Sequence, residues 1–138
     1  MLLVPHPFDP NFLDFSPPQL RMYAGANADH ECLVDEEDYH HFTQWLWLPK
    51  VSPCGKVYFK RSYSVYDLVG QRSGATTLYL HIEILTRAEG PPPTRTRCIA
   101  DHFNGNSLDN RRCNLRWVSK RTNNRNRFGS HFYQRELL

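Results

Sequence analysis

Residues 101–124, with the sequence DHFNGNSLDNRRCNLRWVSKRTNN, hold six asparagines, more than packing alone can use. The local pattern predicts a strand at residues 97–102, a polar loop, a second strand at residues 114–119 and a polar helix from about Lys120 to Arg127. The resulting ββα unit is held together by few apolar side chains: Ile99, Leu108, Leu115, Trp117 and Val118.

Polar side chains lie at the ends of this unit. Asp101 and His102 close the first strand, Asn114 opens the second strand, and Asn123 lies on the helix. A strand–strand–helix arrangement brings the end of the first strand alongside the helix, so Asp101 and Asn123 could share one cation. Carboxylate and amide oxygens suit Mg²⁺, which takes one or two protein ligands and keeps waters and phosphate oxygens as the others.

We expect His102 to have a different task from Asp101, because successive side chains of a strand point to opposite faces. His102 is then free to take a proton from an attacking water, and an ordinary imidazole pKa of about 6.5 suits a base at neutral pH. Asn114 can hydrogen-bond the backbone across the loop and so fix where His102 points.

The segment ADHFNGNSLDNRRCNLRWVSKRTNNRNR resembles the HNH endonuclease family, in particular the phage- and intron-type homing group in which Asn replaces the last His of the motif. The resemblance implies a ββα-metal fold with His102 as general base, Asn114 as the central structural residue, and Asp101 and Asn123 as ligands of Mg²⁺ or Mn²⁺. It also implies double-stranded DNA as substrate, cut in a homing or restriction-like manner to 5′-phosphate and 3′-hydroxyl ends.

The resemblance extends weakly upstream, through LVDEEDYHHFTQWLWL and TTLYLHIEIL. The second segment is similar to one in which the family usually has His followed by Arg. Here Ile82 follows His81, which weakens any functional claim for His81.

The chain as a whole predicts an α+β fold. A ββα-metal nuclease core occupies residues 94–128, and a small elaboration of strands and helix at residues 29–93 packs on it. Residues 1–28 contain five prolines, which prevent a continuous helix or central strand and predict an extended N-terminal arm. Residues 129–138 form a C-terminal tail. Within the elaboration, Asp35 is expected to cap a helix, and residues 76–87 fit either a strand or a helix.

The distribution of charge indicates a phosphate-rich partner. From residue 94 on there are ten Lys and Arg against three Asp and Glu, whereas residues 1–93 carry seven against eleven. A solvated basic surface is the alternative reading, as is a non-catalytic nucleic-acid-binding module that retains the HNH fold. The candidate phosphate contacts are Arg111, Arg112, Arg116, Lys120, Arg121 and Arg125.

The four cysteines are scattered and include no C-x-x-C pair. We favour separate, mostly buried thiols, with a structural zinc as the alternative. The four scattered cysteines are Cys32, Cys54, Cys98 and Cys113.

No apolar run is long enough for a membrane span, and the first residues make a poor signal peptide, so we expect no membrane partner and a cytoplasmic location. A homodimer is an open alternative to a monomer.

Overall fold

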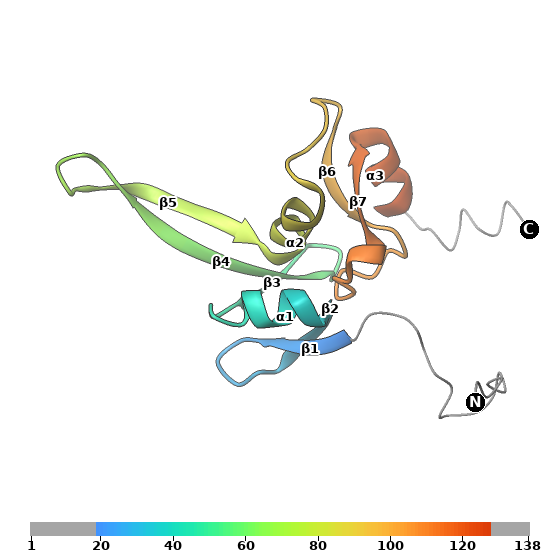
Figure 1. Ribbon diagram of the computed structural model, residues 1–138, viewed down its shortest axis with the longest axis horizontal. Helices are drawn as coiled ribbons and strands as arrows, with labels where there is room; N and C mark the ends of the chain where they lie inside the picture. Colours follow the sequence, from blue (N-terminus) through green and yellow to red (C-terminus); the bar gives the residue numbers. More distant parts are fainter. Residues whose placement is uncertain (1–18, 128–138) are drawn as a thin grey trace, which may run out of the picture.

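The computed structural model describes residues 19–127 (Figure 1). Three antiparallel sheets and three α-helices follow one another along the chain, which makes the fold α+β. The first sheet is the hairpin of β1 (Gln19–Ala24) and β2 (His30–Asp35), and helix α1 (Glu36–Phe42) follows it. None of the helices in this part of the chain is long and apolar enough to cross a membrane.

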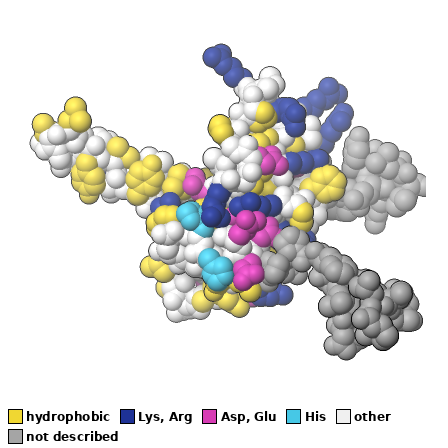
Figure 2. Space-filling view, in the orientation of Figure 1, with side chains coloured by type: hydrophobic (Ala, Val, Ile, Leu, Met, Phe, Trp, Pro, Cys, Tyr) yellow, Lys and Arg dark blue, Asp and Glu magenta, His cyan; other side chains and the backbone are white. Residues whose placement is uncertain are grey.

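The second sheet has three strands in the order β3 (Leu48–Val51), β4 (Val57–Tyr66) and β5 (Arg72–Tyr79). Strands β4 and β5 extend beyond β3 as a two-stranded arm that projects from the body of the molecule (Figure 1). Its tip is ordered by Asp67, whose Oδ1 accepts hydrogen bonds from the backbone N–H groups of Val69 and Gln71. Apolar side chains are spread along this arm (Figure 2).

Helix α2 (Leu80–Glu89) follows β5 directly, which resolves the ambiguity of residues 76–87: the strand ends at Tyr79 and the helix begins at Leu80. Its buried side chains include Leu80, Ile84 and Leu85, the spacing of one helical face. The helix ends at Gly90, whose φ of 88° lies in the left-handed region that glycine adopts most readily.

The last part of the chain forms the ββα unit. Strand β6 (Arg97–His102) pairs antiparallel with β7 (Leu115–Ser119), and helix α3 (Lys120–Arg127) contacts both strands. A single 3₁₀ turn, η1 (Arg112–Asn114), ends the loop between the strands, so Asn114 lies just before β7 rather than in it. The strand and helix positions otherwise agree with those predicted from the sequence.

One hydrophobic core joins the upstream half of the chain to the ββα unit. Leu115 and Trp117 of β7 are buried in the same cluster as side chains from β1, β2, α1, β4 and α2. Trp117 is thus a core residue, 6% exposed. The largest buried members from the upstream half are Met22, Phe42, Trp47, Phe59, Leu80 and Ile84.

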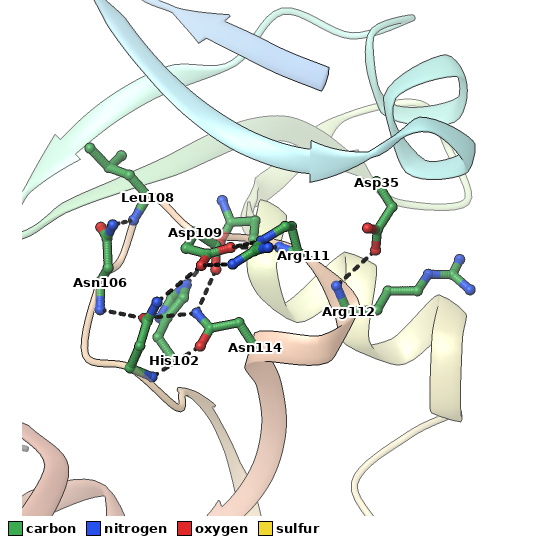
Figure 3. Close-up of polar contacts among 10 residues, drawn as sticks. Asp35, His102, Asn106, Leu108, Asp109, Arg111, Arg112 and Asn114 are labelled. Atoms are coloured by element: carbon green, nitrogen blue, oxygen red, sulfur yellow. Dashed lines mark hydrogen bonds and ion pairs between the residues drawn. The ribbon is translucent and has the colours of Figure 1, made fainter. Parts of the chain in front are cut away.

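Strand β2 also bonds directly to the loop of the ββα unit. The N–H of Leu33 donates to the carbonyl oxygen of Leu108, and the N–H of Asn110 donates to the carbonyl oxygen of Leu33, both at 2.8 Å. Asp35 occupies the N-cap position of α1, yet its side chain makes no cap bond. Its Oδ2 instead accepts the backbone N–H of Arg112 at 2.9 Å, so the expected cap is an anchor for the loop (Figure 3).

The structure differs from the predicted N-terminal arm, residues 1–28, in the part of that segment that it describes. Residues 19–24 form β1, and Met22 and Ala24 lie in the core, each 2% exposed. The prolines that predicted an arm end at Pro18, so they do not interrupt this strand. The rest of the arm, residues 1–18, and the predicted tail, residues 129–138, lie outside the described residues.

Candidate active site

The loop between β6 and β7 is built around the side chain of Asn114, which is 6% exposed (Figure 3). Its Oδ1 accepts the backbone N–H of Asn104 at 3.0 Å, and its Nδ2 donates to Asn104 Oδ1 and to the carbonyl oxygen of Asp109, both at 2.9 Å. Its own carbonyl oxygen accepts the N–H of Phe103 at 2.8 Å. Asn114 therefore holds the backbone directly after His102.

His102 is buried at the end of β6, 6% exposed. Its Nε2 lies 2.8 Å from Oδ1 of Asn110, and because that oxygen can only accept, the neutral ring carries its proton on Nε2. The nitrogen left to accept a proton is then Nδ1. Burial lowers the pKa of His102, against the opposing effects of Asn110 and Asp101, so the ring stays neutral at pH 7.

Asn110 is oriented from its other side by Cys32 of β2, a buried thiol that forms a side-chain hydrogen bond with it. Since Oδ1 faces His102, the amide nitrogen is the group available to the sulfur. Both Cys32 and Asn110 are almost completely buried, at 2% and 1% exposure. The upstream hairpin thus helps to fix the His102 ring.

His81, on the first turn of α2, is a residue whose importance the sequence did not indicate. Its ring centroid lies 5.0 Å from that of His102, and both rings approach Tyr58 of β4. Burial, with a smaller contribution from His102, lowers the pKa of His81 to about 3. A neutral imidazole therefore packs against the candidate base. The signal available in the sequence was that His81 is four residues from Leu85 on the apolar face of a helix.

Asp101 is directed toward β7 and α3. Its Oδ2 accepts a hydrogen bond from Arg116 Nε at 3.0 Å, and both of its oxygens accept from Asn126 Nδ2, at 2.9 and 3.0 Å. The helix amide in direct contact with Asp101 is therefore that of Asn126. Asn123, three residues earlier, lies on a neighbouring position of the same helix face and lines a cavity with Asp101 and His102.

That cavity, of about 380 Å³, is the space in which a substrate could meet these side chains. One side of it comes from β6 and α3 and another from β4, α2 and the turn between β3 and β4. The residues that line the cavity include Lys56, Tyr58, His81, Asp101, His102 and Asn123. Asp101 is the one carboxylate among the described residues that line it.

A divalent cation fits this donor set. Between residues 19 and 127, no three His, Cys, Asp or Glu side chains come together as a metal site. Mg²⁺ needs only one or two protein oxygens, and Asp101 together with an asparagine of α3 provides them. The Asn126 amide now donates to Asp101, and the same side chain turned about its last bond would offer its oxygen instead.

Arg111, Arg112 and Arg116, which were predicted as phosphate contacts, bind carboxylates within the protein. Arg111 pairs with Asp109 through two hydrogen bonds of 2.7 Å, and Arg112 pairs with Asp38 through two of 2.9 Å. These carboxylates hold the pKa of both guanidinium groups above the ordinary value. Arg116 binds Asp101 and lies over the ring of Phe103, 4.6 Å from its centroid.

The other three basic residues lie on α3. Lys120, Arg121 and Arg125 are exposed and, with Asn124, line a shallow depression on the helix surface. Lys and Arg side chains gather on the side of the molecule that α3 occupies (Figure 2). The structure therefore places half of the predicted basic set on one helix, next to the cavity.

The cysteines differ from the expectation of mostly buried thiols. Cys32 is buried, whereas Cys54, Cys98 and Cys113 are exposed, and none of these four described residues forms a disulfide. The spacing of the cysteines carries no information on burial. The exposed residues Cys54, Cys98 and Cys113 each lie in or beside a turn or at a strand edge.

Comparison with known proteins gives a family match over the last part of the chain. Residues 78–125 match a family model described as HNH endonuclease. The match begins on β5 and includes His81, Asp101, His102, Asn114 and Asn123. No curated protein and no solved structure matches the chain.

Proposed function

We propose that this protein, whose residues 78–125 belong to the HNH endonuclease family, is a metal-dependent endonuclease that hydrolyses double-stranded DNA with His102 as general base. The observation that carries the proposal is the setting of His102. The ring is held by Asn110 at 2.8 Å, is kept neutral by burial, and borders the same cavity as Asp101. A base that is neutral and oriented is what the activation of water requires.

The chemistry assigned to the chain's residues is a single displacement. Nδ1 of His102 accepts a proton from a water molecule as the water oxygen attacks phosphorus. The bond between phosphorus and the 3′ oxygen breaks, and that oxygen takes a proton from solvent, which leaves 5′-phosphate and 3′-hydroxyl ends. Asn114 holds the backbone after His102 and thereby the position of the ring.

Asp101 and an asparagine of α3 would hold the divalent cation, Mg²⁺ or Mn²⁺. When bound, the cation supplies positive charge that stabilises the transition state and the departing oxygen. Asn123 and Asn126 both qualify, Asn123 because it lines the cavity and Asn126 because it touches Asp101. For its carboxylate to bind a cation, Asp101 must give up part of its contact with Arg116.

Helix α3 would carry the contacts to the DNA backbone. Lys120, Arg121 and Arg125 are exposed beside the cavity, where they can neutralise phosphates without reading sequence. One such site cuts one strand. A monomer would then nick DNA, and a homodimer could cut both strands.

A plasmid-nicking assay tests the proposal. Wild-type protein with Mg²⁺ should relax supercoiled DNA, EDTA should abolish the reaction, and His102→Ala should slow it at least about 100-fold, the usual contribution of a general base. His40→Ala is the matched control, because His40 is an exposed histidine of α1. Nicking by His102→Ala at the wild-type rate would refute the assignment of the base.

The pH dependence of nicking gives a second test. Because burial lowers the pKa of His102, the rate should stay constant as pH falls from 8 through 6.5 and decline only at more acidic pH. A decline centred on 6.5, with the chemical step shown to limit the rate, would contradict this setting of the ring.

The second candidate function is a nucleic-acid-binding module that keeps the HNH fold without turnover. The observation that favours it is the Arg116–Asp101 ion pair of 3.0 Å, which occupies the carboxylate that a cation would need. Binding of DNA without cleavage, with Mg²⁺ and Mn²⁺ each tested up to 10⁻² M, would support this alternative. Arg116→Ala frees the carboxylate, and the appearance of cleavage in that variant would identify the ion pair as the block.

A further inference from the structure

The turn between β3 and β4, with the sequence SPCGK at residues 52–56, forms part of the cavity wall. The N–H of Ser52 donates to the carbonyl oxygen of Lys56 at 2.8 Å, and the N–H of Lys56 donates to Ser52 Oγ at 3.1 Å. Gly55 has a φ of 86°, a conformation that favours glycine. The turn is therefore well defined, and it fixes the backbone from which Lys56 extends.

Lys56 and His102, the candidate general base, line the same cavity. The positive charge of Lys56 contributes to lowering the pKa of His102, after the larger effect of burial. Lys56 is partly buried, whereas Lys50, the other lysine of the cavity wall, is exposed.

The charge of Lys56 is not used within the described part of the protein. Among residues 19–127, none of the ion pairs or side-chain hydrogen bonds involves its ammonium group. Asp101, the carboxylate of the cavity, is bound by Arg116 and Asn126 instead. An unpaired cation at the wall of a partly enclosed cavity is a binding site for an anion.

We propose that Lys56 is a further catalytic residue, whose ammonium group binds a non-bridging oxygen of the scissile phosphate. The proposal rests on the nuclease function put forward above. Attack of water on phosphorus increases the negative charge on the non-bridging oxygens, and a cation already in place stabilises that charge more in the transition state than in the bound substrate. Lysine binds phosphate as a point charge and needs no bidentate geometry.

Lys56 lies outside residues 78–125, so no property of the matched segment assigns it this role. The consequence is that the upstream half of the chain would contribute to catalysis as well as to packing. The water-activating base would come from β6 and the phosphate-binding cation from the turn before β4, both at the wall of one cavity.

The test compares single-turnover nicking at saturating protein for wild type, Lys56→Met, Lys56→Arg and the control Lys60→Met. Lys60 is a partly buried lysine of the adjoining strand β4 and does not line the cavity. Lys56→Met should be about 100-fold slower, the usual cost of removing one donor to a developing negative charge. Lys56→Arg should recover part of the rate, and Lys60→Met should match wild type. A Lys56→Met rate within threefold of wild type would overturn the proposal.

Measurement at pH 8.5 separates a contact with the phosphate from an effect on the base. Loss of the Lys56 charge removes one influence that lowers the pKa of His102, so part of a deficit at pH 6 could come from a protonated ring. At pH 8.5 the ring is neutral in every variant, and a deficit that persists supports the contact with phosphate. Disappearance of the deficit at pH 8.5 would show that Lys56 acts only through His102.

A binding measurement tests the contact without any cleavage. In EDTA, the slope of log affinity for duplex DNA against log salt concentration should fall by about 0.9 in Lys56→Met, the loss of one neutralised phosphate. An unchanged slope would overturn the contact. Wild-type protein that binds DNA but cuts none with Mg²⁺ or Mn²⁺ would refute the nuclease proposal separately, so the two failures can be distinguished.

Discussion

Substitution of Asp38 by alanine should destabilise the protein strongly, because this buried carboxylate connects three segments. Asp38 on α1 is 0% exposed and accepts a hydrogen bond of 3.0 Å from Arg87 of α2 and two of 2.9 Å from Arg112 of η1. Breaking a buried ion pair by removal of one partner typically costs about 3–5 kcal/mol. The side chains of Arg87 and Arg112 are 38% and 28% exposed, so water recovers part of their solvation. We therefore expect a loss of about 3 kcal/mol in the free energy of unfolding.

Urea unfolding followed by circular dichroism measures this loss, and Glu37→Ala is the matched control. Glu37 precedes Asp38 in the chain and contacts the same Arg112 at 3.2 Å, but its side chain is 59% exposed. Its removal should cost at most about 0.5 kcal/mol. If the free energies of unfolding of Asp38→Ala and Glu37→Ala lie within 1 kcal/mol of each other, the desolvation of the buried carboxylate costs about as much as its bonds contribute, and the reasoning fails.

Three further predictions concern buried polar groups. Burial holds the pKa of His81 at about 3, so the unfolded chain alone takes up a proton as pH falls below 6.5. His81 alone should therefore lower the free energy of unfolding by about 2 kcal/mol between pH 7 and pH 5, and in urea titrations the drop of His81→Phe should be smaller than that of wild type by this amount; equal drops in both proteins would contradict it. Burial also raises the pKa of the Cys32 thiol to about 12, so a thiol reagent at pH 8 should modify the folded protein at three cysteines and reach the fourth only in urea. Asn114→Ala leaves the N–H of Asn104 and the buried carbonyl of Asp109 without their partner, and should cost about 2 kcal/mol in the free energy of unfolding; a cost below 1 kcal/mol would show that other bonds order the loop.

The sequence predicted the elements of the ββα unit well because their signals are local. The strand at residues 97–102 and the helix at residues 120–127 agree with the structure. Alternation of side chains, loop residues and a polar helix are each recognised within a few positions. The boundary between β5 and α2 could not be predicted from residues 76–87, because their apolar side chains fit both periodicities and packing against the core decides between them.

The partners of the site residues depend on contacts that are distant in sequence. The pairing of Arg112 with Asp38 could not be predicted from the sequence, because Asp38 lies 74 residues earlier. Asn123 and Asn126 are three positions apart, so both lie on nearly the same face of α3, and the tilt of the helix on β6 decides which one meets Asp101. That tilt is a result of packing and has no local pattern in the sequence.

The ββα unit depends on the upstream half for the order of its candidate site. The unit itself buries few apolar side chains, and the loop that follows His102 is bonded to β2 through Leu33 and to α1 through Arg112. Asn110, which orients His102, is set between that ring and Cys32 of β2. A polar unit of this kind cannot hold one arrangement by its own packing, since the entropy lost on ordering must be offset by burial and hydrogen bonds from elsewhere. The candidate base and the candidate cation ligands therefore lie in the ββα unit, and the rigidity that their geometry requires comes from the strands and helices before it.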